Sequence, residues 1–518
     1  MRPVVVIGAG PVGQTAALLL ARWGLPVLVL DGRPRRDAVG SRAICQQRDV
    51  LDIWDVVGAG EQIAAEGVTW TTARTYYRDR ELFALTLADR GRSPFPPFVN
   101  ISQSRTEEIL DERIAATPSI EVRWDHQVTD LAEDAEGVTL RCRDEPIRAR
   151  YVLVCAGAQA GPLHDALGIS FNGRSFDDRF LICDIRAELP GWEAERRFHF
   201  DPSANPGRQV LVHPCPDSTY RIDWQVPPDF DLDAERACGA LDARIRQVVG
   251  QRHYEIVWHS VYRFHTLLAD RMGTGRVLLA GDAAHLYAPF GARGLNSGVA
   301  DAENAAWKVA AALRGSGGEA LLDSYHAERH AAAVENAEIT SATMRFLVPP
   351  DEAARRHRRD VLDRAVTDPA ARAEVDSGRL SEPFAYADSP LTTPERTRPF
   401  PGRPPRGTSP PSCPGVIVPD VPLRVQGRSR RLARSGFTVL AGPGVEPEPL
   451  RAEAGTAVRA PVAVHALDAI DVDAALAEAL DARDGEVWVL RPDAHIAAAL
   501  PSPAPGAVAA ALRRTLGH

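Results

Sequence analysis

The chain has 518 residues, which is enough for two to four domains at the usual size of about 100–200 residues each. Its apolar content of 45% and charged content of 25% are those of a globular protein. The formal net charge of -9 argues against a nucleic-acid or anionic-membrane partner, because phosphate binding requires a basic surface.

The cysteines and the apolar runs bear on the compartment. The seven cysteines are scattered and form no C-x-x-C pair, so we expect neither a disulfide framework nor a metal site. A reducing cytosol is the compartment that this cysteine usage favours. The chain starts with a strand-like run rather than a basic segment and a cleavable apolar one, which predicts no signal peptide. The longest apolar stretch is shorter than the ~20 residues of a membrane span. A cytoplasmic protein without a membrane partner is therefore expected.

The N-terminal segment has the pattern of a dinucleotide-binding unit. A hexapeptide, GAGPVG at 8–13, separates a strand-like from a helical run, and a second strand ends in Asp31. Gly8 permits a tight turn, Gly10 lets the backbone approach a pyrophosphate, and Gly13 lets the helix pack closely on the strand. The helix N-terminus would meet the phosphate charge and Asp31 the ribose hydroxyls. The expected elements are the strand 4–7, the helix 12–23 and the strand 27–30.

The middle of the chain mixes strand and helix patterns. Alternation of apolar and polar residues predicts a half-buried antiparallel sheet, and a later buried strand precedes a glycine-rich loop. Two long helical patterns follow, of which the second is amphipathic. The expected elements are the strands 208–213, 220–226 and 275–280 and the helices 298–314 and 321–346.

The last quarter of the chain begins with a change in composition. Residues 390–422 are rich in Pro, Arg, Ser and Gly, which predicts a linker or an irregular arm. A small α/β domain is expected beyond it. Its expected elements are the strands 437–441 and 486–490 and the helices 474–482 and 507–516.

A second motif, GDAAH at 281–285, follows the buried strand and precedes the loop 289–298. The carboxylate of Asp282 can accept from ribityl hydroxyls. Backbone N–H groups from Gly294 to Asn296, at a helix start, can face the electron-rich pyrimidine edge of a flavin. For Asp282 alone, a helix N-cap is the alternative. Together the two motifs favour FAD, and a nicotinamide-only dehydrogenase is the remaining alternative.

With these motifs, the helix 301–310 and the segments 41–43 and 100–103, the chain resembles the flavoprotein aromatic hydroxylases of the para-hydroxybenzoate hydroxylase type. It is most similar to the branch with 3-(3-hydroxyphenyl)propionate hydroxylase and polyketide-tailoring monooxygenases. The resemblance implies an α/β fold in three parts. These are a Rossmann-like FAD-binding domain (1–70, 99–170 and 270–395), a middle mixed-sheet substrate domain (71–98 and 171–269), and a Pro-rich linker with a C-terminal thioredoxin-like domain (396–518). Lacking C-x-x-C, that last domain should be structural, with dimerisation as one role.

The resemblance also implies the chemistry. Members bind FAD non-covalently, reduce it with NADH or NADPH, and form a C4a-hydroperoxide with O2 that hydroxylates an aromatic or polyketide-like substrate. The residues implied at FAD are Gly8, Gly10, Val12, Gly13, Asp31, Arg42, Ala43, Gln103, Gly157, Asp282, Pro289, Gly294, Leu295 and Asn296. Among these, the guanidinium of Arg42 suits the pyrophosphate or the isoalloxazine.

One family motif is altered. Members usually carry Asp-Gly after a strand, followed by Ser and Arg, in contact with FAD and the nicotinamide nucleotide. Here the strand 151–154 continues into Ala156-Gly157, and the usual arginine position is near His164. Alanine neither orients an arginine nor accepts from a ribose. Two alternatives therefore stand beside ordinary hydroxylation: another oxidation or ring rearrangement with atypical reductant use, and a non-catalytic flavin-binding partner of a pathway enzyme.

Oxygen transfer requires a dry pocket over the flavin and a base that deprotonates a phenol. We expect the pocket between the FAD domain and the middle sheet. His213 is the candidate base, because the unperturbed pKa of histidine is close to neutrality, and Tyr262 is the second candidate catalytic residue. The expected walls are Trp224, Phe264 and Phe290. Packing is the alternative, since a histidine without an observed partner does not establish catalysis and aromatic side chains dominate cores.

Overall fold

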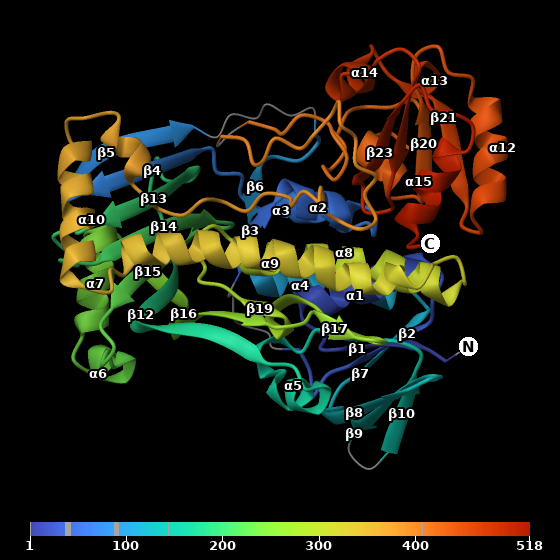
Figure 1. Ribbon diagram of the computed structural model, residues 1–518. Coiled ribbons are helices and arrows are strands. Elements are labelled where there is room, and N and C mark those ends of the chain that lie inside the picture. The colour runs from blue at the N-terminus through green and yellow to red at the C-terminus, as the bar shows by residue number, and fades with distance from the viewer. Residues whose placement is uncertain (1, 37–42, 87–92, 143–144, 406–407) are drawn as a thin grey trace.

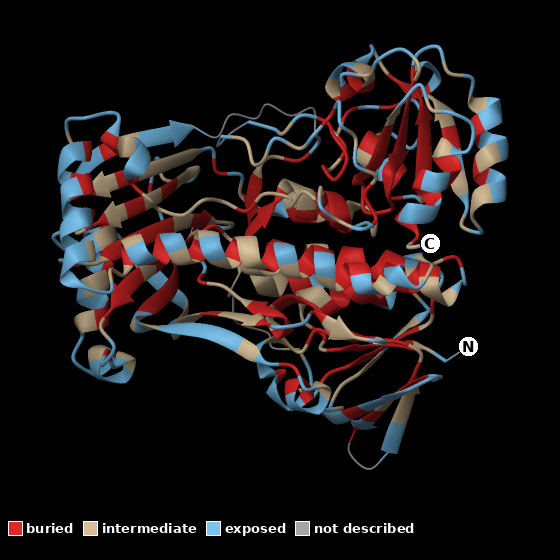
Figure 2. Cartoon of the chain, viewed as in Figure 1, coloured by how far each residue is buried: buried red, intermediate tan, exposed pale blue. Residues whose placement is uncertain are grey.

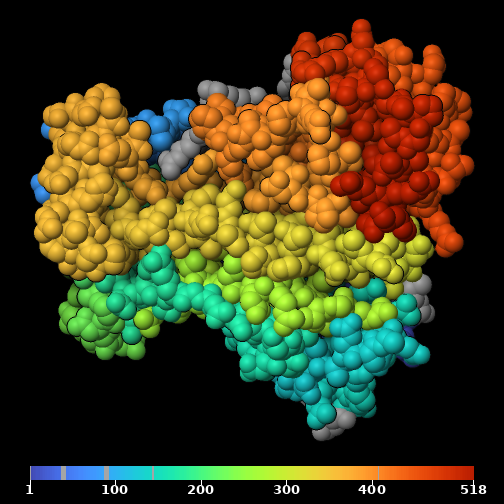
Figure 3. Space-filling view, viewed as in Figure 1, coloured from blue at the N-terminus to red at the C-terminus, as the bar shows by residue number. Residues whose placement is uncertain are grey.

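The computed structural model describes residues 2–36, 43–86, 93–142, 145–405 and 408–518. The described chain forms three large sheets, and helix α9 (Ala320–Leu347) runs from the eight-stranded sheet at the left to the space between the six-stranded and the C-terminal sheet at the right (Figure 1). In the space-filling view α9 forms a yellow ridge between the C-terminal domain and the rest of the chain (Figure 3). Its visible side carries a stripe of exposed residues, whereas the strands behind it are mostly buried (Figure 2).

Around the first glycine motif lies a six-stranded sheet, in the order β17-β18-β11-β1-β2-β7 within the described residues. All neighbours pair in parallel except β17, which is antiparallel to β18. Its strands are β1 (Val4–Ile7), β2 (Val27–Leu30), β7 (Ile120–Arg123), β11 (Val152–Val154), β17 (Gly273–Thr274) and β18 (Val277–Leu279). The short, continuously apolar strands are those of a parallel sheet buried on both faces.

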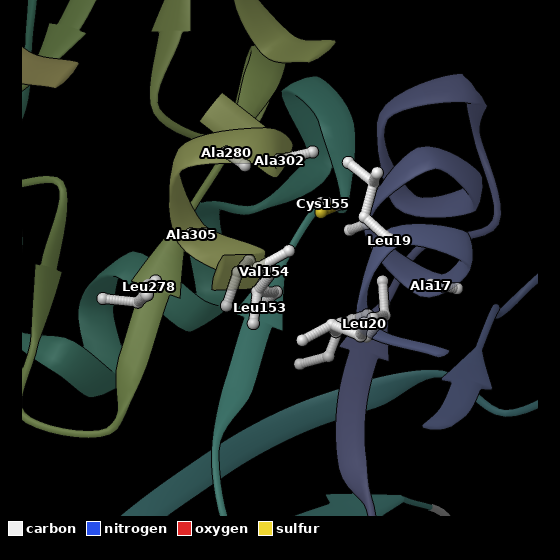
Figure 4. Packing of buried hydrophobic residues seen from close by; sticks show 14 of the residues in the cluster. Ala17, Leu19, Leu20, Leu153, Val154, Cys155, Leu278, Ala280, Ala302 and Ala305 are labelled. Carbon is white, nitrogen blue, oxygen red and sulfur yellow. The ribbon is translucent and has the colours of Figure 1, made fainter. Parts of the chain in front are cut away.

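Helices α1 (Pro11–Arg22) and α8 (Arg293–Leu313) pack against this sheet and against each other. Figure 4 shows Leu19 of α1 and Ala302 of α8 on either side of Cys155, which directly follows β11. Small residues on α8 allow this close approach. The smaller elements around this layer are α2 (Arg48–Asp55), α3 (Gly60–Glu66), α4 (Gln103–Ala115), α5 (Gly161–Leu167), the pair β3 (Cys45–Gln47) and β6 (Phe98–Asn100), and the sheet β8 (Val128–Asp134), β9 (Gly137–Cys142) and β10 (Glu145–Ala149).

The second large sheet has eight strands in the order β19-β16-β12-β15-β14-β13-β4-β5 within the described residues. Only β13 and β4 pair in parallel. Helices α6 (Leu232–Ala237) and α7 (Ala240–Val249) cover one face, and α9 with α10 (Glu352–Ala365) packs toward the other. The strands are β4 (Thr72–Tyr77), β5 (Arg80–Thr86), β12 (Phe171–Ala187), β13 (Glu195–Phe200), β14 (Gln209–Cys215), β15 (Thr219–Val226), β16 (Tyr254–Ala269) and β19 (His285–Leu286).

After η3 (Ala371–Glu374) the described chain is irregular up to α11 (Ser429–Ala433) and runs from α10 to the C-terminal sheet (Figure 1). That sheet has the order β21-β20-β22-β23, parallel between β20 and β21 and antiparallel elsewhere. Helices α12 and α15 cover one face, and α13 and α14 the other. The bounds are β20 (Phe437–Ala441), α12 (Pro447–Ala457), β21 (Val462–Ala466), α13 (Leu467–Ile470), α14 (Ala475–Leu480), β22 (Glu486–Leu490), β23 (Ile496–Pro501) and α15 (Ala507–Thr515).

The expected α/β fold class is confirmed, whereas the division of the chain into domains remains our interpretation of these sheets. The start of α8 differs from the prediction. It begins at Arg293, five residues before the predicted 298, because Gly294 and Gly298 made the first turns look like loop. Helix α10 was not predicted at all.

Candidate functional site

The first glycine motif has the geometry that a bound pyrophosphate requires. Gly8 has φ +105°, and a Cβ there would lie 2.3 Å from the carbonyl oxygen of Cys155. A Cβ on Gly13 would lie 1.9 Å from the carbonyl oxygen of Gly8. At Gly10, the N-cap of α1, an added Cβ meets no atom within 4 Å. Two glycines are therefore required by packing, while the third leaves open space at the helix N-terminus, where an anion binds favourably.

Asp31 closes this loop at the end of β2. Its carboxylate accepts from the backbone N–H of Ala9 at 2.8 Å and from the guanidinium of Arg33 at 3.0 Å. Burial would raise the pKa of Asp31, but these hydrogen bonds outweigh it and hold the pKa below its ordinary value. Asp31 is therefore ionised at neutral pH, as acceptance from ribose hydroxyls requires, and in this structure Arg33 is the donor to its carboxylate oxygens.

Sequence reasoning missed Arg36. Its guanidinium donates to the carbonyl oxygen of Ala9 at 2.9 Å and to Glu107 at 2.7 Å, and it lies over the ring of Trp124. A cation is thus fixed beside the glycine loop. The run of arginines after Asp31 was the available signal, but nothing in the spacing distinguishes Arg36 from its neighbours.

The second motif is at the N-terminus of α8. Asp282 lies within the short helix η2 (Gly281–Ala283), whose N-cap is Ala280, and the N-cap of α8 is Ala292. The N-cap alternative for Asp282 is therefore wrong. A Cβ on Gly294 would lie 3.9 Å from Oδ1 of Asp282, so this carboxylate stands beside the first turn of α8.

Ala292 itself has a strained backbone. It adopts φ 55° and ψ 41°, a left-handed conformation that costs a residue with a Cβ about 1–2 kcal/mol. Its side chain cannot cap the helix, so the first N–H groups of α8, which have no partner within the helix, remain available. Pro289 fixes the preceding turn, because its carbonyl oxygen accepts from the N–H of Ala292 at 3.0 Å. Such strain is typical of a position held for ligand contact.

Val12 brings the two motifs together. A Cβ on Gly281 would lie 3.0 Å, and one on Gly298 2.6 Å, from Cγ2 of Val12. These three residues belong to α1, η2 and α8, so any larger residue at either glycine would separate the motifs. The N-termini of α1 and α8 are thereby held at one place, as a dinucleotide that spans both requires. Leu295, one turn into α8, packs on the same core.

Asn296 fixes strand β3 against α8. Its amide accepts from the N–H of Gln47 at 3.0 Å and donates to the carbonyl oxygen of Cys45 at 3.0 Å. Nearby, Oε1 of Gln103 accepts from the N–H of Ala43 at 3.1 Å. The structure thus joins predicted flavin residues from three separate segments. Arg42, predicted at the same place, lies outside the described residues.

The segment after β11, where the family motif is altered, has an arrangement without the usual aspartate and arginine. Gly157 has φ +63° and begins η1 (Gly157–Gln159), directly after Ala156. His164, near the position of the usual arginine, is buried, and its Nε2 lies 2.7 Å from the carbonyl oxygen of Ala283. The imidazole of His164 therefore ties α5 to the residue after Asp282, without the Asp–Arg arrangement of the family.

A network of buried charged side chains connects α8 with the second motif and with α9. Asp301 accepts from the N–H of Gly281 at 2.9 Å, from Nε2 of His285 at 2.7 Å and from Arg329 at 2.6 Å. Burial would raise the pKa of Asp301, but Arg329 and His285 outweigh it and lower the pKa. His285 thus holds the carboxylate of Asp301 in place. The carboxylate of Asp301 fixes the backbone at which the second motif begins.

The middle sheet presents one polar face toward these motifs. Three rows of paired residues cross it, one residue per strand in each row. The charged row contains Ala73, Arg196, His213, Arg221, Asp184 and Trp258. The next row contains Phe198, Leu211, Asp223, Ile182 and Ser260, and the aromatic row Phe200, Gln209, Gln225, Phe180 and Tyr262. Leu211, Phe180 and Phe198 share a buried cluster with Phe290, so the loop of the second motif packs on this face.

Of the predicted substrate-site residues, the structure brings His213, Tyr262, Phe264 and Phe290 to this face. Phe264 stacks on Phe180 at 4.4 Å between ring centroids and meets Phe290 edge-on at 6.1 Å. The expectation for Trp224 is wrong. Alternation along β15 places it on the opposite face, fully buried against α7.

The reason given for His213 as a base is also wrong. Burial, together with the charges of Arg196 and Arg221, lowers its pKa well below the ordinary value. His213 is therefore neutral at physiological pH but a weak proton acceptor. Asp223, on the next strand, is the titratable group that sequence reasoning missed. No pattern in the sequence distinguishes it from the other aspartates of the sheet.

Two hollows are found on the outer surface. One, of about 580 Å³, is lined by 229–233 and 259–261 at the edge of the sheet. The other, of about 550 Å³, lies between 174–178 and 345–362 and reaches Gln225 of the aromatic row. Within the described residues no group of His, Cys, Asp and Glu is arranged to hold a metal ion. No helix in the described part of the chain combines the length and apolarity that a membrane crossing demands.

The observed geometry fits FAD: an open position at Gly10, acids at Asp31 and Asp282, and an uncapped helix N-terminus at Ala292. Comparison with known proteins agrees. The model of a family described as an FAD-binding domain matches residues 1–340. Two curated relatives are 3-(3-hydroxy-phenyl)propionate/3-hydroxycinnamic acid hydroxylases from Mycobacterium sp. (strain JLS) and Comamonas testosteroni, 29% and 27% identical. These matches cover 70% and 69% of this chain, and 62% and 61% of the relatives.

Solved structures match nearly the whole chain. The flavin-dependent monooxygenase PieE, in complex with FAD and substrate, superposes with a TM-score of 0.85 at 25% identity, covering 99% of both chains. Aklavinone-11 hydroxylase, in complex with FAD and aklavinone, has a TM-score of 0.80 at 24% identity, covering 100% of this chain and 99% of the other. The expected α/β fold class is confirmed by this coverage. The chain belongs to the FAD-binding monooxygenase family.

Proposed function

We propose that the protein hydroxylates an aromatic or polyketide-like small molecule with O2, using FAD and NADH or NADPH. The observation that supports this most is the junction at Val12, which holds both glycine motifs together opposite the polar face of the middle sheet. Relatives and solved neighbours carry names of hydroxylases of such compounds. FAD, when bound, supplies the electron transfer and the oxygen chemistry.

The residues of the chain would divide the work. Gly10 and the N-terminus of α1 would bind the pyrophosphate, and Asp31 the ribose. Asp282 would accept from the ribityl chain, and the N–H groups at the start of α8 would face the pyrimidine edge. Phe290 and the aromatic row would exclude water from the substrate.

The decisive experiment uses purified protein reconstituted with FAD and a panel of phenols and polyketide-like naphthols. We expect a yellow protein whose oxidation of NADH or NADPH, with O2 uptake, rises on addition of one of them. Mass spectrometry should show a product heavier by one oxygen. Protein that binds FAD but shows no stimulated oxidation with either nucleotide would refute the proposal.

One observation favours a second candidate. With Ala156 and His164 in place of the family's Asp and Arg, the nucleotide contact that those residues provide is missing. The same site could then serve another oxidation or rearrangement, fed by a different reductant. A product with unchanged oxygen content, or flavin reduced by a partner protein and not by NAD(P)H, would identify this case. Bound FAD that no reductant reduces would indicate a non-catalytic partner.

A further inference from the structure

The polar face of the middle sheet holds a carboxyl group that no part of the fold requires. Asp223 lies on β15 between Leu211 and Ile182, two apolar neighbours on the adjacent strands. Its Oδ1 is buried and has no hydrogen-bond partner within the described residues. Leaving a buried acceptor unpaired costs about 1–3 kcal/mol, so such a group is explained by a missing ligand more readily than by stability.

The surroundings of Asp223 are strongly polar. The charge of Arg221 is already paired, because its guanidinium forms a bidentate ion pair with Asp184 at 2.8 Å. Arg196 has no such partner among the described residues: its Nη2 donates to the carbonyl oxygen of Ser377 at 2.8 Å. The buried guanidinium of Arg196, which has no carboxylate partner among the described residues, thus interacts electrostatically with the unpaired carboxyl group of Asp223.

This space adjoins the flavin motifs. Arg196 pairs with Ala73 of β4, which packs on the cluster of Cys45, Trp70 and Phe98 together with Ala292 of the second motif. Asn100 of β6 donates to the carbonyl oxygen of Pro214 on β14 at 2.8 Å and so fixes the flavin side against the sheet. The groove of about 550 Å³ on the outer surface reaches Gln225, two residues from Asp223 on the same face.

We propose that Asp223 accepts the proton of the substrate's ring hydroxyl group and that Arg196 faces the oxygen anion that remains. The substrate class is therefore a phenol or an enolised polyketide that reacts as its anion. The O–H bond breaks, its proton passes to Oδ1 of Asp223, and the electron pair stays on the substrate oxygen. The carboxylic acid later returns the proton to water. This inference rests on the proposed function and names the base of its site.

The charges around Asp223 agree with this role. Burial, aided by Asp184, raises the pKa of Asp223 to about 7, while Arg221 and Arg196 oppose the rise. A base with a pKa near the working pH is the most effective. His213 lies diagonally across from it on β14, opposite Arg221, and is neutral because its pKa is lowered. The thiols of Cys45, Cys183 and Cys215 also interact with these charged groups, and burial raises the pKa of each, so that they are uncharged.

The test uses 4-nitrophenol, whose neutral and ionised forms absorb differently, bound to the FAD-loaded protein without reductant. In the wild-type protein we expect the bound probe to ionise at lower pH than the free probe, with an acid dissociation constant at least tenfold larger. Asp223→Asn should remove the gain while the affinity for FAD stays the same. Asp223→Glu should retain part of it, and Asp217→Asn, in the exposed turn between β14 and β15, all of it.

Two results would overturn the assignment. One is a bound probe whose ionisation is the same in wild type and Asp223→Asn. The other is wild-type protein that leaves the spectrum of the probe unchanged. Either can occur while phenols still stimulate NAD(P)H oxidation, so failure of this inference is distinguishable from failure of the proposed function. A second readout is the infrared band of a protonated carboxyl group near neutral pH, which Asp223→Asn should remove.

Discussion

Gly10 and Gly13 are three residues apart, but the structure predicts opposite effects for their replacement by alanine. At Gly13 the added Cβ would lie 1.9 Å from the carbonyl oxygen of Gly8, whereas ordinary contact begins at 3.4 Å. Helix α1 would have to move by about 1.5 Å from β1. Overpacking of this kind costs about 1–3 kcal/mol. We therefore expect Gly13→Ala to lose both stability and FAD.

At Gly10 the added Cβ meets no atom, and the backbone, at φ -73° and ψ 178°, is one that alanine adopts. Losing glycine from the N-cap costs about 1 kcal/mol at most, and the stiffer unfolded chain offsets about 0.4–1 kcal/mol of it. The free energy of unfolding without FAD should therefore change by less than about 0.5 kcal/mol. The methyl group would, however, fill the space that we assign to the pyrophosphate, and the Kd for FAD should rise at least tenfold, about 1.4 kcal/mol.

The assay combines urea unfolding of the FAD-free protein with titration of FAD by flavin fluorescence. Gly161→Ala is the matched control, since it also begins a helix with open space around its Cβ but carries no expected FAD contact. Undiminished FAD affinity in Gly10→Ala would refute the pyrophosphate position. A loss of stability in Gly10→Ala equal to that in Gly13→Ala would refute the distinction between the two glycines.

Three further predictions concern stability. Glu328→Gln should cost about 3–5 kcal/mol in urea unfolding, because Lys308 and Arg491 lose a fully buried partner, while the surface change Glu352→Gln should be silent. Asn296→Ala should cost about 2–4 kcal/mol and weaken FAD binding, since two backbone groups of β3 lose their partner; unchanged affinity would contradict the role of β3. The pKa of Asp223 is about 7 in the folded protein against 3.8 in the unfolded chain. The stability that this difference contributes is fully present below about pH 4 and is lost as pH rises through about 7. Wild type should therefore lose more stability over that range than Asp223→Asn, and parallel pH curves would contradict the raised pKa.

Much of the fold was predictable because local rules dominate it. The strands 4–7, 27–30, 437–441 and 486–490 were predicted with their observed bounds, since short, mostly apolar runs beside turn residues leave few alternatives. The glycine motifs were recognisable because their spacing reflects close packing. By contrast, the face on which Trp224 lies depends on the strand register, which a run of eight residues does not reveal. The pKa values of Asp223 and His213 depend on Arg196 of β13, and that of Asp223 also on Asp184 of β12, and these strands are distant in sequence.

The C-terminal sheet contacts the layer of the two glycine motifs through a buried ion pair. The one cysteine within the described residues after 395, Cys413, is buried, so no dithiol acts there. Instead Arg491, after β22, inserts between the layers and binds Glu328 of α9, whose other cationic partner among the described residues is Lys308 of α8. Without Arg491, the buried carboxylate of Glu328 would have Lys308 as its one cationic partner among the described residues, which would destabilise the fold. Because Arg329, next to Glu328, holds Asp301 and through it Gly281, the domain stabilises the backbone from which the second flavin motif begins.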